Sequence, residues 1–108
     1  MKSSQAVAAL AALSQETRLA VFRQLVAAGP QGKAAGAIAA HLKVPPPTLS
    51  FHLKELERAR LVTQRREGRN IIYAANYTTM RALLSHLMED CCGGRPEICA
   101  IDIKCCAA

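Results

Sequence analysis

The sequence has few aromatic residues and no apolar run long enough to cross a membrane. Phe and Tyr make up 4% of the 108 residues, and Trp does not occur. Apolar stretches fall short of the roughly 20 residues that a membrane helix needs, and the first residues lack the pattern of a secretory signal peptide. We therefore expect a cytoplasmic protein without a membrane partner. One domain is expected at this length, and abundant Ala and Leu favour helices.

Patterns typical of an enzyme active site are also missing. No nucleophile is accompanied by a base and an orienting group, and no glycine-rich loop is suited to a nucleotide. We therefore expect that the protein is not an enzyme.

Positive charge is concentrated in the first three quarters of the chain. The net charge is +6 at pH 7, but residues 1–81 carry twelve Lys and Arg against four Asp and Glu, whereas residues 82–108 carry two against four. A basic body suits a polyanionic partner, of which nucleic acid is the commonest.

Three helical patterns occupy the first 42 residues. The first, over residues 4–13, is weakly amphipathic, with Val7 and Leu10 on one side. The second begins after Ser14, a candidate N-cap, and ends before Gly29, and the third spans residues 33–42. Apolar side chains of the second and third helices are expected to face the core: Leu19, Phe22, Leu25, Val26, Ile38, Ala39 and Leu42.

The segment PPPTLSFHLKELERARL, residues 45–61, predicts a helix that begins near Pro46 or Pro47. Its leucines form one apolar stripe at helical spacing: Leu49, Leu53 and Leu56. The opposite side carries more polar residues and one aromatic residue: Thr48, Ser50, Phe51, Lys54, Glu55 and Arg58. Because about three residues join this helix to the preceding short one, the pair has the layout of a helix-turn-helix unit.

A β-hairpin is predicted directly after this unit. The β-prone runs at residues 62–66 and 70–73 flank Gly68, which can adopt the positive φ of a tight turn. Three arginines lie near its tip: Arg65, Arg66 and Arg69. Behind a helix-turn-helix unit such a hairpin acts as a wing, so we expect a mainly α-helical, winged helix-turn-helix fold.

The last predicted helix, over residues 77–90, has a wide apolar face for a small domain. This face consists of Met80, Leu83, Leu84, Leu87 and Met88. The apolar faces of the first and last helices both need to be buried. We therefore expect these helices to pair with their counterparts in a twofold homodimer, which would suit a palindromic DNA site.

Three segments together resemble the ArsR/SmtB family of bacterial metal-sensing repressors: LSQETRLAVFRQL, SFHLKELERARLV and RREGRNIIYAA. The resemblance covers roughly residues 6–90, so we expect residues 1–90 to form the DNA-binding and dimerisation domain. It implies a homodimer that binds operator DNA, represses a resistance operon and releases DNA when a metal or metalloid binds.

The resemblance also assigns roles to single residues. Thr48, Ser50 and Lys54 are expected to face the DNA groove or its phosphates, and the wing arginines Arg65, Arg66 and Arg69 to neutralise phosphates. His52 belongs to the family's S-x-H-L-x-x-L pattern and is either a DNA contact or a packing histidine. The chain departs from the family at Arg60, where a glycine commonly closes the recognition helix, so a different helix end is expected there.

Two effector sites known in the family find little support in this chain. The C-V-C-type cluster of one arsenite-sensing class is missing from residues 33–42. His86 and Glu89 match half of a zinc site between last helices, but Tyr73 and Ala75 stand where the other half would be. His86 is therefore interpreted as a surface or interface histidine.

The five cysteines all lie in a polar tail, residues 91–108, which we interpret as a metalloid-binding segment. Thiolates select soft ions, and As(III) takes three sulfurs. The tail resembles that of arsenite-responsive members with a sulfur site after the last helix, which implies Cys91, Cys92 and Cys99 as ligands of As(III) or Sb(III). Cys105 and Cys106 are secondary candidates.

Three alternatives stay open for the thiols. They could respond to another soft metal such as Cd or Zn, or they could form disulfides under oxidant and make a redox-responsive repressor. A metal-carrying protein is the alternative from another class, although a carrier would not need the basic helix-turn-helix.

Overall fold

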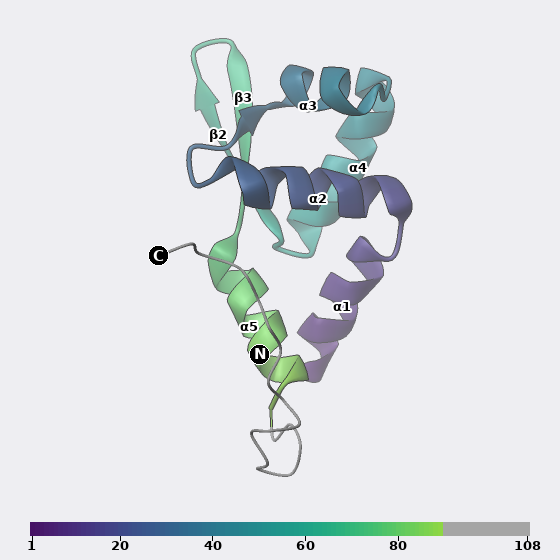
Figure 1. The fold of residues 1–108 in the computed structure, drawn as a ribbon, viewed down its shortest axis with the longest axis vertical. Coiled ribbons are helices and arrows are strands. Elements are labelled where there is room, and N and C mark those ends of the chain that lie inside the picture. The colour runs from purple at the N-terminus through teal and green to yellow at the C-terminus, as the bar shows by residue number, and fades with distance from the viewer. Residues whose placement is uncertain (90–108) are drawn as a thin grey trace.

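The computed structural model describes residues 1–89, which form a mainly helical domain with a small antiparallel sheet (Figure 1). The elements in chain order are α1 (Ser3–Leu13), α2 (Glu16–Ala28), β1 (Lys33–Ala34), α3 (Ala35–Leu42), α4 (Pro46–Arg58), β2 (Val62–Glu67), β3 (Asn70–Ala75) and α5 (Tyr77–Leu87). This architecture confirms the expected winged helix-turn-helix fold. None of the helices in this part of the chain is long and apolar enough to cross a membrane.

The three strands pair in the order β1-β3-β2, and β1 corrects one prediction. Lys33 and Ala34 were expected to begin a helix, but they pair with Tyr73 and Ile72 of β3. Gly32, with a φ of 73°, brings the backbone so close to β3 that an added Cβ would collide with the Tyr73 carbonyl oxygen. Pairing with β3, which local periodicity cannot reveal, therefore holds residues 33 and 34 in a strand, and α3 begins at Ala35.

The predicted hairpin is confirmed. Glu67 pairs with Asn70, which leaves Gly68 and Arg69 as a two-residue turn, and Gly68 has a φ of 61°. A positive φ at the first turn position matches the twist of the flanking strands and favours glycine. Only Val62 of β2 is buried, so most of this strand projects into solvent as a wing.

Helix α4 begins at Pro46 and buries the predicted leucine stripe, which is at most 2% exposed. Its end differs from the expectation. Arg60 adopts a φ of 64°, its amide donates to the Glu57 carbonyl oxygen at 2.9 Å, and the Leu61 amide donates to the Leu56 carbonyl oxygen at 3.0 Å. These two hydrogen bonds form a Schellman motif, so Arg60 takes the left-handed position that glycine usually occupies.

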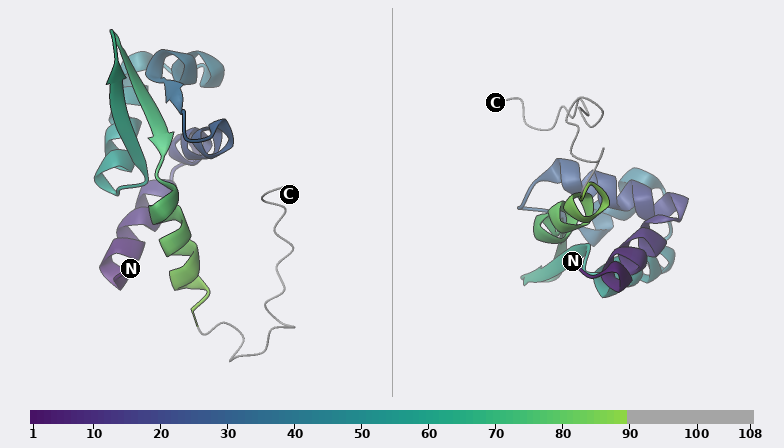
Figure 2. Two further views of the ribbon diagram at one scale, coloured as in Figure 1. Left: turned by 90° about the vertical axis from the view of Figure 1, so that its left-hand side faces the viewer. Right: turned by 90° about the horizontal axis from the view of Figure 1, so that it is seen from below.

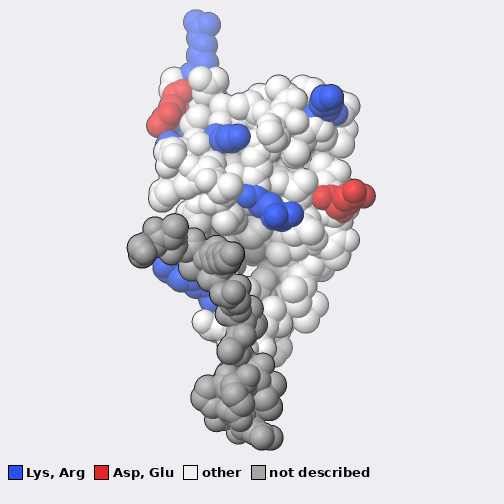
Figure 3. Space-filling model, in the orientation of Figure 1, with Lys and Arg blue, Asp and Glu red and all other residues white. Residues whose placement is uncertain are grey.

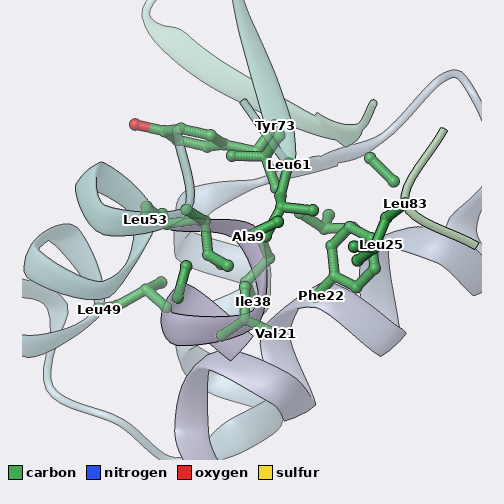
Figure 4. Close-up of a cluster of buried hydrophobic side chains, with 14 of the residues drawn as sticks. Ala9, Val21, Phe22, Leu25, Ile38, Leu49, Leu53, Leu61, Tyr73 and Leu83 are labelled. Carbon is green, nitrogen blue, oxygen red and sulfur yellow. The ribbon is translucent and has the colours of Figure 1, made fainter. Parts of the chain in front are cut away.

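The core lies where α2, α3 and α4 meet the sheet (Figure 4). Phe22 and Leu25 of α2 are buried as predicted, but Leu19 is 44% exposed and Val21 is fully buried in its place. The cap of α2 also differs from the prediction, because the side chain of Gln15 accepts a hydrogen bond from the Arg18 amide. Ser14 instead closes α1, since its hydroxyl donates to the Ala11 carbonyl oxygen.

Helices α1 and α5 lie at the end of the molecule opposite the hairpin tip (Figures 1 and 2). Helix α1 buries only three alanines, Ala6, Ala9 and Ala12. Leu83 is the buried residue of α5, whereas Leu84 and Leu87 are 45% and 54% exposed. Both helices thus keep large apolar side chains in contact with solvent.

Candidate nucleic-acid interface

The exposed side of α4 carries the polar residues that the sequence suggested for DNA contact. Thr48, Ser50 and Lys54 are all exposed, while the leucine stripe on the other side holds the helix against the core. Helix α3 precedes α4 through a short turn in which Lys43 adopts a φ of 56°. The helix-turn-helix layout thus leaves one polar side of the second helix open to solvent.

His52 lies on the protein-facing side of α4 and is 8% exposed. Its Nδ1 atom is 3.4 Å from Nη1 of Arg18, whose Nε donates a hydrogen bond to the Ala12 carbonyl oxygen at 2.7 Å. Because arginine can only donate, this contact requires an unprotonated Nδ1. Burial and the positive charge of Arg18 both lower the pKa of His52. Of the two interpretations of His52, the structure supports the packing histidine.

Phe51 is the residue of α4 to which sequence reasoning gave no role. Its side chain is 57% exposed, and its ring makes a T-shaped contact with the His52 ring, with centroids 5.5 Å apart and planes at 62°. The helical period placed this residue on the outward side, so a large apolar side chain among polar neighbours was the signal that could have marked it.

The three arginines of the hairpin differ in how they are held. Arg65 donates to the Gln31 carbonyl oxygen at 2.6 Å and pairs with Glu67 at 3.1 Å, which fixes its guanidinium against the loop before β1. Arg66 and Arg69 are exposed, and no hydrogen bond or ion pair within residues 1–89 engages their side chains. They are therefore available to an external anion.

A hydrogen bond joins the hairpin to the second helix of the helix-turn-helix unit. The Gln64 amide nitrogen donates to Oε2 of Glu57 at 2.8 Å. This exposed contact links β2 to α4, in addition to the burial of Leu61 and Val62 in the core. Figure 3 shows one face of the domain, with a positive side chain projecting at the hairpin tip and further Lys and Arg side chains spread below it.

The described residues hold no cluster of three or more potential metal ligands. Nδ1 of His86 lies 3.8 Å from Oε2 of Glu89 near the end of α5, and this pair is the half-site that the sequence suggested. The predicted As(III) ligands, Cys91, Cys92 and Cys99, and the secondary candidates Cys105 and Cys106 lie outside the described residues.

Similarity to known proteins agrees with this geometry. A family model described as a helix-turn-helix domain matches residues 13–65. An ArsR-like transcriptional regulator from Rhodococcus sp. RHA1 is 26% identical, with a TM-score of 0.74, over 91% of this chain and 90% of that one. NolR from Sinorhizobium fredii is 30% identical, with a TM-score of 0.63, over 79% of this chain and 85% of that one. No curated protein matches the sequence.

A third solved structure is the homodimeric winged helix-turn-helix DNA-binding domain of Mb0332 from Mycobacterium bovis, described as a possible ArsR-family transcriptional regulator. It is 26% identical, with a TM-score of 0.66, over 79% of this chain and 83% of that one. The fold, the exposed polar side of α4, the basic hairpin and these similarities point to the same group of proteins. The chain has a helix-turn-helix domain and shares the winged fold of the ArsR-family transcriptional regulators among its structural neighbours.

Proposed function

We propose that the protein is a homodimeric repressor that inserts α4 into the major groove of operator DNA. The observation that carries this proposal is the exposed side of α4, with Thr48, Ser50 and Lys54, beside a hairpin whose Arg66 and Arg69 have no partner within residues 1–89. Hydroxyl and ammonium groups can bond base edges or phosphates, while the hairpin arginines neutralise the backbone and hold the domain in register.

The dimer is proposed from the apolar side chains that α1 and α5 leave in solvent. Val7 and Leu10 of α1 are 65% and 43% exposed, and Leu84 and Leu87 of α5 are exposed to a similar degree. Large apolar side chains gathered at one end of a small domain are typical of a protein interface. The Mb0332 domain is homodimeric, which supports the same assembly here.

Sedimentation at micromolar concentration tests the dimer. The wild type is expected to sediment as a dimer, and Leu84→Glu as a monomer, because the substitution puts a charge into the apolar contact. The neighbouring Ser85→Glu adds the same charge at another exposed position of α5 and is expected to stay dimeric. A stable wild-type monomer would contradict the proposal.

The effector proposed for this repressor is As(III), or the related Sb(III), bound by the thiolates of Cys91, Cys92 and Cys99. Three thiolates suit a soft trivalent ion, and Cys91 follows the end of α5 by four residues. Ligand capture next to the dimer helices would favour an arrangement of the two α4 helices that binds DNA less well. Effector and DNA must then weaken each other's binding by the same factor.

A gel-shift on the protein's own promoter tests this effector, with arsenite, Zn²⁺, Cd²⁺ and peroxide added separately. Arsenite is expected to release DNA from the reduced protein, and Cys91→Ser and Cys92→Ser to bind DNA normally but resist release. Cys105→Ser serves as the matched control and is expected to respond like the wild type. Retention of the operator with stoichiometric arsenite bound would contradict the proposal, and release by peroxide alone would favour the redox alternative.

The pH dependence of effector binding separates a metalloid from a divalent metal. Arsenious acid that reacts with three thiols releases water and no net proton, so its affinity should change little with pH. A divalent metal displaces thiol protons and binds more tightly as pH rises. Titrations at two pH values distinguish these ions, and a strong pH dependence would count against As(III).

A further inference from the structure

Phe51 stands at the centre of the outward side of α4. It lies two residues from both Leu49 and Leu53, which are buried, so the helical period turns it to the opposite side. Lys54 follows it by three residues and therefore shares that side. The chain has two Phe and two Tyr, all within residues 1–89, and Phe51 is the one of these four that is exposed.

The exposure of this ring is not explained by folding of the domain. Burial of a Phe side chain stabilises a protein by roughly 1.5–3 kcal/mol, and Phe51 at 57% exposure forgoes much of that. It belongs to α4, whereas the exposed leucines Leu10, Leu84 and Leu87 belong to α1 and α5, the helices at the end of the molecule opposite the hairpin tip (Figure 1). Its position instead coincides with the surface that a helix-turn-helix protein presents to DNA.

The Phe51 ring contacts one buried neighbour. Phe51 makes a T-shaped contact with the His52 ring, and His52 contacts Arg18, which donates a hydrogen bond to the Ala12 carbonyl oxygen. The contact with His52 removes some of the Phe51 ring's freedom before any ligand binds. The cost of ordering it against a ligand is therefore lower than for a ring without this contact.

We propose that Phe51 reads sequence by packing its ring against the 5-methyl group of a thymine in the major groove. This inference rests on the proposed insertion of α4 into DNA. The thymine methyl is the apolar group that base pairs expose in the major groove, and phenylalanine is among the side chains that contact it. Lys54 on the same side would hold a phosphate or base edge, so the two residues divide recognition between apolar and charged contacts.

Deoxyuridine substitution provides the test, because it removes the methyl group and leaves base pairing unchanged. A preferred duplex is first selected with the wild-type protein from a random pool, and each thymine is then replaced singly. Loss of one methyl contact is expected to weaken wild-type binding about fourfold at the contacted position. Phe51→Ala is expected to bind more weakly and to lose this discrimination at that position alone.

Two further variants make the result specific. Phe51→Leu keeps an apolar contact and is expected to retain part of the preference for thymine over deoxyuridine. Lys54→Ala is expected to weaken binding to the thymine duplex and to the deoxyuridine duplex by the same factor. If Phe51→Ala kept the wild-type ratio of affinities for the thymine and deoxyuridine duplexes at every position, the inference about Phe51 would be wrong, but the proposed DNA binding would not be contradicted. If the wild type bound no duplex at all, the proposed function itself would fail.

Discussion

The guanidinium of Arg18 lies against the ring of His52, with 3.4 Å between Nη1 and Nδ1. The same guanidinium donates from Nε to the Ala12 carbonyl oxygen at 2.7 Å. One side chain of α2 therefore touches both the last turn of α1 and the helix proposed to enter DNA. Arg18 thus links α1 and α4 within one subunit.

Acid should destabilise the protein through His52. Burial and Arg18 lower the pKa of His52 in the folded state. The unfolded chain then binds the proton more readily, so this contribution to stability is present above about pH 6.5 and is lost as the pH falls through the lowered pKa. The free energy of unfolding in urea should therefore decrease from pH 7.5 to pH 5 in the wild type.

His52→Gln should reduce this pH dependence, because its amide can accept a hydrogen bond from Arg18 but does not titrate. His41→Gln is the matched control, since His41 is exposed on α3, and its variant should keep the wild-type profile. An equal pH dependence in His52→Gln and the wild type would contradict the prediction.

Two glycine substitutions should have opposite effects on stability. Gly32→Ala places a Cβ against the Tyr73 carbonyl oxygen at a φ of 73°, so it should separate β1 from β3 and destabilise the protein by about 2 kcal/mol or more. Gly36 lies within α3, and an added Cβ meets nothing within 4 Å. Gly36→Ala should therefore stabilise by up to about 1 kcal/mol through helix propensity.

Urea unfolding of the two alanine variants beside the wild type measures both effects. Equal stabilities for Gly32→Ala and the wild type would show that the approach of residue 32 to β3 is looser than the structure indicates.

The salt dependence of DNA binding should distinguish the hairpin arginines. Arg66→Ala or Arg69→Ala should lower the slope of log Kd against log salt by about 1, because each removes one phosphate contact. Arg65→Ala should change the slope less, because its guanidinium is already bonded to Gln31 and Glu67. Fluorescence anisotropy across a salt series measures the slopes, and a larger change for Arg65→Ala would reverse the order.

Arg60→Gly should stabilise the fold by about 1 kcal/mol. The residue holds a left-handed conformation with a φ of 64°, which costs a side-chain-bearing residue energy that glycine avoids. Arg60→Ala keeps the strain and serves as the control for loss of the long side chain. Thermal and urea unfolding of both variants test this, and a glycine variant no more stable than the alanine variant would contradict it.

Patterns with a clear period were predicted well from the sequence. The leucine stripe of α4 and the paired runs of the hairpin follow from spacing and from Gly68, because local chemistry determines them. The inward side of α2 was partly wrong, with Leu19 exposed and Val21 buried. This helix packs against several other elements, so the side it buries depends on their arrangement and not on its own period.

Contacts between distant residues account for the rest of the site that sequence reasoning missed. β1 has only two residues, and its pairing depends on β3 nearly forty positions later. The sequence left His52 as either a DNA contact or a packing histidine, because its contact with Arg18, thirty-four residues away, does not follow from local patterns. The cysteine ligands lie outside the described residues and remain a prediction from the sequence.

The alanine side of α1 gives this helix few large apolar contacts with the rest of its own subunit. Ala6, Ala9 and Ala12 offer single methyl groups to the core, so their burial contributes little compared with that of leucine. The Arg18 bond secures only the last turn. We therefore expect α1 to unwind first in an isolated subunit. If the proposed dimer forms, α1 should fold as the second subunit binds it, so helix content should rise with protein concentration.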